Sequence, residues 1–112
     1  RPFHLAFPVT DLLESKKWYT DILGCSIGRE SKDWVDFNMF GHQIVAHLTD
    51  SQDTIDTNLV DGERVPIRHF GVILEFSEWD VLKQNLVLFK MYFQKTYYFS
   101  ECIFPSVFFI VF

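Results

Sequence analysis

The chain has 112 residues, of which 48% are hydrophobic, and this is enough for one small domain with its own core. Fifteen acidic against ten basic residues give a formal net charge of −5, which argues against nucleic acid as a partner and favours a small-molecule ligand. The longest apolar run, 103–112, is about half as long as a membrane-spanning helix, so we expect no membrane partner. Two cysteines form no disulfide framework, which is typical of a cytoplasmic protein.

The chain begins with a predicted strand at 3–9, because its residues alternate between two faces. The apolar face consists of Phe3, Leu5, Phe7 and Val9. His4 lies on the opposite face. A helix is expected from 11 to 23, since Asp11 begins a capping-box-like segment and Gly24 is a natural stop.

Three more strands complete the first half of the chain. A short strand is expected near 25–30, and two alternating strands follow at 33–40 and 43–48, joined by a tight turn at 41–42. The rows that oppose their apolar residues consist of Trp34, Asp36, Asn38, Gln43, Val45 and His47. The order of the first half is therefore βαβββ, and His42 falls in the turn, where it faces solvent.

The pattern then restarts after a polar segment. Residues 51–66 predict an exposed linker. A strand is expected at 67–76, and His69 stands opposite its apolar row. A helix is expected at 78–89, with Ser77 as its N-cap.

The two halves resemble each other, because each is a strand with a histidine near its start followed by a helix. We therefore expect a single domain of two βαβββ-type modules, the second shortened or divergent. Module one spans 1–50, the linker 51–66 and module two 67–112. The predicted fold class is α+β, a curved mixed sheet with helices on the outside and a concave cleft, in which His4 and His69 occupy equivalent places.

The last 24 residues, 89–112, hold about half of the chain's aromatic residues, only three charges and no glycine. Strands are expected at 91–99 and 102–112. Such an apolar tail has to be buried by the fold or by a partner, and this favours a homodimer.

Three histidines are predicted to share the face of the sheet that points away from the helices. A curved sheet brings His4, His47 and His69 together in its cleft. A single histidine in a strand is more often structural, but three on matched faces predict a site for a divalent metal such as zinc, nickel, iron or manganese.

Three other side chains project into the same predicted cavity: Trp34, Asn38 and Gln43. They either contact a substrate or fill space, and Gln43 is also placed to serve as a further ligand. For Asp36, which shares this face, a hydrogen bond within the hairpin is the expected role.

Three segments carry a resemblance to a known family: "HLAFPVTDLLESKKWYTDILG", "WVDFNMFGHQIVAHL" and "RHFGVILE". They are similar to the vicinal oxygen chelate superfamily, the group of glyoxalases, bleomycin resistance proteins and extradiol dioxygenases. The similarity covers residues 3–88. Residues 89–112 do not match, and the family's "D-P-x-G-N-x-x-E" strand, whose glutamate binds metal, has no counterpart in the sequence.

The resemblance implies paired βαβββ modules around one divalent metal. Its ligands would come from the first and last strands of the modules, and the matching positions here are His4, His69 and His47. In related enzymes the position matched by His47 is often Glu or Gln.

Two classes of function follow from the resemblance. The first is a metal-dependent enzyme of isomerase, lyase or dioxygenase type, in which the metal binds two adjacent oxygens of a small substrate. The second is a metal-free binding protein of bleomycin-resistance type that sequesters a small molecule. A degenerate, inactive member of the family is a further alternative. Homodimers are common in this superfamily.

Overall fold

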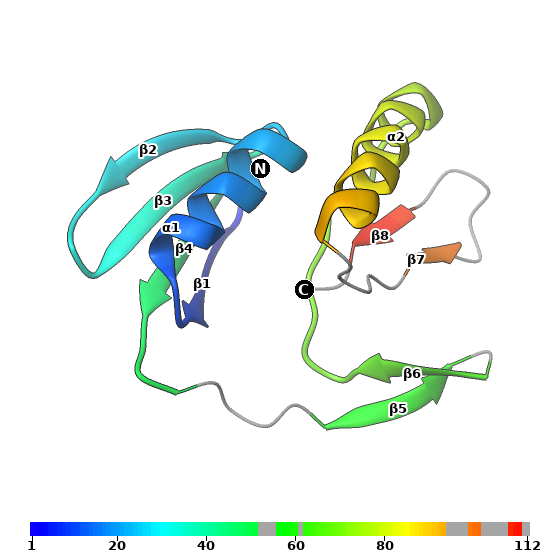
Figure 1. Ribbon diagram of the computed structural model, residues 1–112, viewed down its shortest axis with the longest axis horizontal. Helices are drawn as coiled ribbons and strands as arrows, with labels where there is room; N and C mark the ends of the chain where they lie inside the picture. Colours follow the sequence, from blue (N-terminus) through cyan, green and yellow to red (C-terminus); the bar gives the residue numbers. More distant parts are fainter. Residues whose placement is uncertain (52–55, 61, 94–98, 102–107, 111–112) are drawn as a thin grey trace. The chain divides into compact units, whose positions relative to one another are not determined.

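The structure of the chain is a computed structural model that describes residues 1–51, 56–60, 62–93, 99–101 and 108–110 (Figure 1). The chain divides into two units, Arg1–Asp53 and Thr54–Phe112. Both units contain strands and a helix, so the predicted α+β class is confirmed.

The first unit contains one mixed four-stranded sheet in the order β1-β4-β3-β2. Its elements are β1 (His4–Val9), the α-helix α1 (Leu12–Lys17), the π-helix η1 (Trp18–Ile22), β2 (Ser26–Glu30), β3 (Trp34–Met39) and β4 (His42–Leu48). β1 runs parallel to β4, whereas β3 is antiparallel to both β4 and β2. The βαβββ order predicted for the first half of the chain is therefore confirmed.

The helical segment of the first unit begins and ends as its sequence predicts. The Asp11 side chain accepts a hydrogen bond from the Glu14 N–H at 2.9 Å, which satisfies one of the unpaired donors in the first turn. After η1 the chain reverses at Gly24, whose φ of 71° is a conformation that glycine adopts without strain. The Cys25 N–H then donates to the Tyr19 carbonyl at 2.8 Å and closes the segment.

One face of the first sheet packs against α1 and η1 (Figure 1). The Tyr19 ring lies 5.5 Å from the ring of Phe7 and 4.7 Å from that of Phe37, measured between centroids. The side chains of this face that are at most 1% exposed are Val35, Phe37, Met39, Ile44 and Ala46. The opposite face carries His4, Asp36, Asn38, Gln43 and His47, and we call it the histidine face.

The turn between β3 and β4 lies one residue earlier than predicted. Phe40 and Gly41 are its two central residues, and both have positive φ, 51° and 89°. Two-residue hairpin turns favour this conformation because its twist matches that of the strands. The Gly41 N–H donates to the Asn38 side-chain oxygen at 2.7 Å. His42 is consequently the first residue of β4 and is not in the turn.

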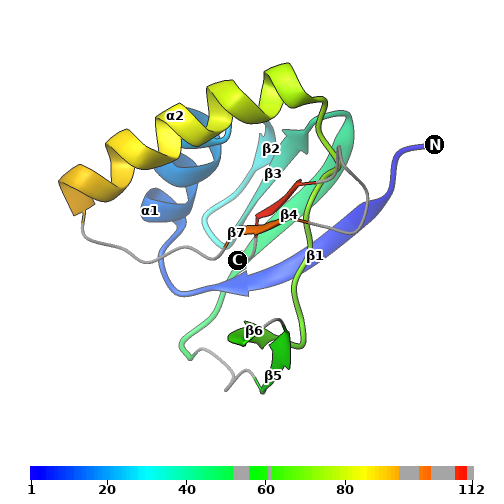
Figure 2. The ribbon, with the colours of Figure 1, turned by 90° about the vertical axis from the view of Figure 1, so that its right-hand side faces the viewer.

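The second unit consists of two hairpins and one long helix. β5 (Thr57–Val60) pairs with β6 (Glu63–Pro66), α2 spans Phe76–Phe93, and β7 (Phe99–Glu101) pairs with β8 (Phe108–Ile110) (Figure 2). Both strand pairs are antiparallel. Gly62, with φ 87°, lies in the turn between β5 and β6.

The second unit differs from its predicted form in a hairpin, in residues 67–75 and in the length of its helix. The hairpin β5–β6 lies inside the segment expected to be a linker, because its residues turn back at Gly62 and pair. Residues 67–75, expected to be a strand, form none in the part of the chain that the structure describes. Alternation alone does not make a strand, since a strand also needs a hydrogen-bonded neighbour.

The helix α2 is longer than the predicted 78–89 and takes in the start of the strand expected at 91–99. The rest of the predicted strands 91–99 and 102–112 lies partly outside the described residues. The buried stripe of α2 consists of Trp79, Leu82 and Leu86, as their spacing predicts. The Glu75 N–H donates to the Glu78 carboxylate at 3.0 Å, so this pair and not Ser77 marks the start of the helix.

None of the described helices is long and apolar enough to cross a membrane.

Candidate functional site on the histidine face

A polar row crosses all four strands of the first sheet. His4 on β1 stands opposite Gln43 on β4, Gln43 opposite Asn38 on β3, and Asn38 opposite Ser26 on β2. Cross-strand partners point to the same side of a sheet, so the four side chains form one strip on the histidine face. This strip contains three of the predicted site residues, namely His4, Asn38 and Gln43.

His47 and Trp34 belong to a different row of the same face. His47 stands opposite Pro8 on one side and Trp34 on the other. It follows Gln43 by four positions along β4, which corresponds to about 13 Å at roughly 3.3 Å per residue. The structure therefore places Gln43, and not His47, beside His4.

A chain of polar contacts links His4 to a buried carboxylate. The His4 Nδ1 and the Gln43 Oε1 are 2.9 Å apart, and the Gln43 Nε2 donates to the Asp36 Oδ2 at 3.1 Å. The Arg29 Nε donates to the same Asp36 oxygen at 3.2 Å. Asp36 is only 6% exposed, and it is the buried charged residue of the described structure. Because Gln43 lies on β4 and Asp36 on β3, the hydrogen bond within the hairpin that was expected for Asp36 is confirmed.

The position of Arg29 depends on an irregularity in β2. The register between β2 and β3 shifts between Ile27 and Glu30, as in a β-bulge. Gly28 lies against Asp36, where an added Cβ would come within 3.3 Å of the Asp36 Cβ. The Arg29 guanidinium carbon lies 5.7 Å from the centre of the Trp34 ring, so its cationic group lies between a carboxylate and an indole.

His69, in the second unit, also has a partner for its ring. Its Nδ1 lies 2.7 Å from the main-chain oxygen of Pro66, the last residue of β6. His69 is exposed and follows the hairpin β5–β6 without belonging to a strand. For the His47 ring, no hydrogen bond to another described residue is present.

The described residues do not by themselves assemble a complete metal site. Among them, no three His, Cys, Asp or Glu side chains lie close enough together to hold a metal ion. The donor chemistry of single residues does fit a metal, since His4 and His69 are both exposed and each uses Nδ1 in a hydrogen bond.

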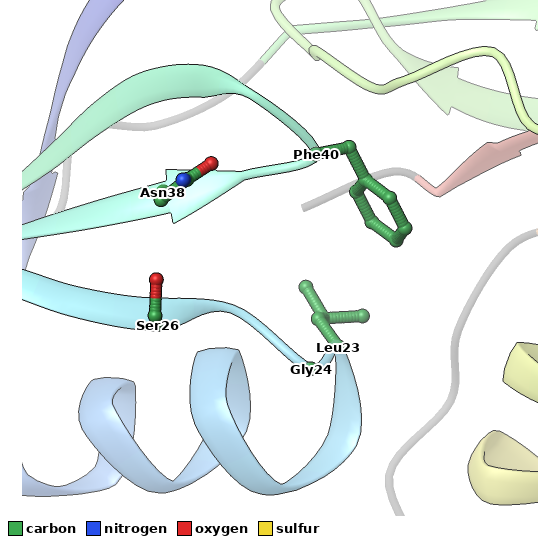
Figure 3. A pocket seen from close by; sticks show the side chains of 5 residues that line it. All are labelled: Leu23, Gly24, Ser26, Asn38 and Phe40. Atoms are coloured by element: carbon green, nitrogen blue, oxygen red, sulfur yellow. The ribbon is translucent and has the colours of Figure 1, made fainter.

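A pocket of about 210 Å³ lies at the Ser26 end of the polar row (Figure 3). Its lining residues are Leu23, Gly24, Ser26, Asn38 and Phe40. Figure 3 shows the Ser26 hydroxyl directed toward β3, with the Asn38 amide on the neighbouring strand. The Asn38 oxygen accepts from Gly41, so the amide NH2 is the group that remains for a ligand.

Two ionisable groups lie in the core beneath η1 and take no part in this face. Burial raises the pKa of the Cys25 thiol to about 11. Burial, and secondarily the charge of Cys25, raises the pKa of the Tyr19 hydroxyl above its ordinary value. The buried Cys25 thiol therefore stays protonated near neutral pH.

The prediction that His42 lies in the turn is wrong, and its side chain is half-buried. Its ring stacks on the Phe3 ring with 4.2 Å between centroids, and its Nδ1 accepts a hydrogen bond from the Phe3 N–H at 3.1 Å. The contact arises because His42 begins β4 next to the entry of β1. His42 therefore anchors the start of the chain.

A family model covers most of the chain. The model described as Glyoxalase/Bleomycin resistance protein/Dioxygenase superfamily matches residues 1–90. The chain belongs to this superfamily. The resemblance carried by the histidine-containing segments is thereby confirmed. A comparison with curated proteins found no match.

Several solved structures of this superfamily are similar to the chain. A glyoxalase/bleomycin resistance protein/dioxygenase from Alicyclobacillus acidocaldarius is 28% identical, with a TM-score of 0.64 over 92% of this chain and 72% of that chain. A domain from Frankia sp. EAN1pec is 20% identical, with a TM-score of 0.59 over 96% and 86%. The fosfomycin resistance protein FosX from Listeria monocytogenes, complexed with Mn(II) and sulfate, is 13% identical, with a TM-score of 0.59 over 88% and 66%. The likeness to the last two concerns the fold alone.

The sequence did not identify the two side chains that contact the Asp36 carboxylate, Gln43 and Arg29. Asp36 was recognised as part of the face but not as a partner of Gln43, although alternation places both on one side of neighbouring strands. Arg29 had no such signal, because its position depends on the irregular register of β2.

Proposed function

We propose that the two units form the two modules of a metal-dependent member of the superfamily. In this proposal His4 and His69 are ligands of a divalent metal. The ligand is a small molecule with two adjacent oxygens, and the reaction is of isomerase, lyase or dioxygenase type. The metal, when bound, supplies a Lewis acid that stabilises negative charge on those oxygens.

One observation carries this proposal. The two histidines at equivalent places of the repeat both use Nδ1 in a hydrogen bond to an amide-type oxygen, Gln43 Oε1 for one and the Pro66 carbonyl for the other. Histidines that bind metal through one ring nitrogen almost always donate the other N–H to a carbonyl or carboxylate. Nδ1 of both rings is thus used in the same kind of hydrogen bond, whereas the His47 ring has no such bond to a described residue.

The comparisons support a metal of this class without naming it. FosX, whose fold this chain shares, has been crystallised with Mn(II) and a sulfate ion. We propose manganese or zinc as the first metals to test. The surrounding residues suit an anionic ligand: the Arg29 guanidinium lies over Trp34, and Gln43 and Asn38 present amides on the same face.

We propose a substrate contact for His47 and not a ligand role. It lies about 13 Å along β4 from the residue beside His4, whereas two nitrogens on one metal lie within about 4 Å of each other. Its cross-strand neighbour is Trp34, which we also place at the substrate.

The proposal is tested by metal titration of the purified full chain. Mn²⁺ and Zn²⁺ binding is measured by calorimetry for the unmodified protein and for His4→Ala, His69→Ala, His47→Ala and His42→Ala. We expect one metal per chain, lost in the first two variants and retained in the last two. His42→Ala is the matched control, since its ring is used to anchor the start of the chain. Binding that survives His4→Ala and His69→Ala contradicts the proposal.

The second candidate is metal-free sequestration of a small molecule. It is favoured by the pocket lined by Ser26 and Asn38 and by the Arg29–Trp34 stack, which need no metal to bind a ligand. A protein that binds neither Mn²⁺ nor Zn²⁺, yet is stabilised against heat by a small anionic aromatic compound, supports this candidate over the first.

A further inference from the structure

We infer that Asp36 is a positioning residue for His4, acting through Gln43. The buried carboxylate dictates which way the Gln43 amide points, and the amide dictates which ring nitrogen of His4 carries the proton. The use of this arrangement in metal binding rests on the proposed function, whereas the arrangement itself does not.

The first step is the orientation of the Gln43 amide. Asp36 is paired with the Arg29 guanidinium, and its carboxylate oxygens only accept hydrogen bonds. The Gln43 atom 3.1 Å from Asp36 Oδ2 is therefore the NH2 group and not the oxygen. Amide orientation is assigned from such networks, and here an acceptor-only partner leaves a single choice.

The second step follows from the first. With its NH2 on Asp36, Gln43 turns its Oε1 to His4, 2.9 Å from the ring Nδ1. An amide oxygen has no proton to give, so Nδ1 must be the donor. The neutral ring then has its lone pair on Nε2, which is the nitrogen that can bind a metal or accept a proton.

We call the hydrogen-bonded series Asp36–Gln43–His4 the relay. The local fold explains why these three side chains are held in place. Gln43 lies on a central strand between β1 and β3, so His4 and Asn38 flank it in register. On β3, Asp36 lies two positions before Asn38 and therefore on the same face of the sheet. Gly28 on β2 leaves space beside Asp36 that a side chain would fill. Arg29, Asp36, Gln43 and His4 thus all lie within the first unit.

The relay is tested on the metal-free full chain by the ¹⁵N chemical shifts of the His4 ring, which differ for a protonated and an unprotonated nitrogen. The measurement is made at about pH 9, above the range in which histidine normally changes charge. We expect the proton on Nδ1 in the unmodified protein. In Asp36→Asn we expect a mixture of tautomers, because an Asn side chain offers Gln43 either a donor or an acceptor.

The matched control is Asp33→Asn, which makes the same chemical change at an exposed aspartate in the loop before β3. It should leave the His4 shifts unchanged. Gln43→Met, at an exposed position, removes the acceptor and should also give a mixture; it carries the test if Asp36→Asn does not fold. A proton that stays on Nδ1 in Gln43→Met or in folded Asp36→Asn overturns the inference, as does a mixture in the unmodified protein.

A second measurement separates this inference from the proposed function. Mn²⁺ affinity is compared between Asp36→Asn and Asp33→Asn, and we expect it to fall by about 10- to 100-fold in the former only, as when an outer partner of a metal ligand is removed. Equal affinities in the two variants overturn the positioning role. A fixed His4 tautomer in a protein that binds no metal supports the relay and contradicts the metal proposal.

Discussion

His4 and His69 make the same kind of contact by different means. The His4 ring bonds to the side chain of Gln43, 39 residues along the chain, and this contact exists only when β1 and β4 pair in the observed register. The His69 ring bonds to the main-chain oxygen of Pro66, three residues before it, which requires only a local bend after β6. The two halves of the proposed site therefore depend on different levels of the structure.

This difference decides what disturbs each histidine. His4 depends on the stability of the first sheet and on three other side chains, all of which can be changed by substitution. His69 depends on a carbonyl that every residue possesses. Substitutions in the first sheet should therefore change the hydrogen bond of the His4 ring, whereas the hydrogen bond of the His69 ring should withstand side-chain substitutions.

The largest effect is expected from removing the centre of the first core. Phe37 is 1% exposed and stacks on Tyr19, so Phe37→Ala removes a large buried ring and leaves a cavity. We expect the free energy of unfolding to fall by about 3–5 kcal/mol. The measurement is urea unfolding followed by circular dichroism.

The control for this prediction is Leu13→Ala, since Leu13 is 65% exposed on α1. It should change stability by no more than about 0.5 kcal/mol. Equal losses in Phe37→Ala and Leu13→Ala would mean that the face packed on η1 is not what holds the first sheet, and the dependence of His4 on that sheet would then be wrong.

A smaller effect of opposite sign is expected at the β3–β4 turn, which sets the register of Gln43. Phe40 has a φ of 51°, and this conformation costs an ordinary residue about 1–2 kcal/mol. Phe40→Asn creates Asn-Gly, the favoured pair for such a turn, and should raise the free energy of unfolding by about 1 kcal/mol. Phe40→Ala removes the same ring without this benefit, so a gain of equal size in both variants would contradict the explanation.

The rows of the first sheet could be predicted because strand geometry has a period of two. Once β3 and β4 were recognised as a hairpin, the alternation placed Asn38, Gln43 and His47 on one side. Alternation does not state how far along a row each residue lies, however. That required the register of β1 on β4, which is a long-range parallel pairing, and it separates His47 from His4.

The remaining differences have equally specific causes. Arg29 reaches Asp36 through an irregular register that no periodic pattern encodes. The turn was predicted one residue late because Phe40 is not a residue expected at positive φ. Residues 67–75 alternate as a strand does, yet the described structure gives them no strand partner, and His69 is consequently positioned by its neighbours in sequence.

The smallest effect is expected at Pro66, and it tests the local half of the comparison. Pro66→Ala keeps the carbonyl that accepts from His69, and alanine can adopt the φ of about −65° that proline imposes. We expect the ¹⁵N shifts of the His69 ring to stay those of a ring protonated on Nδ1, whereas Gln43→Met changes those of His4. If Pro66→Ala instead releases the His69 proton, the proline ring and not the carbonyl sets the contact. His69 would then depend on a side chain as His4 does, and the distinction between the two histidines would disappear.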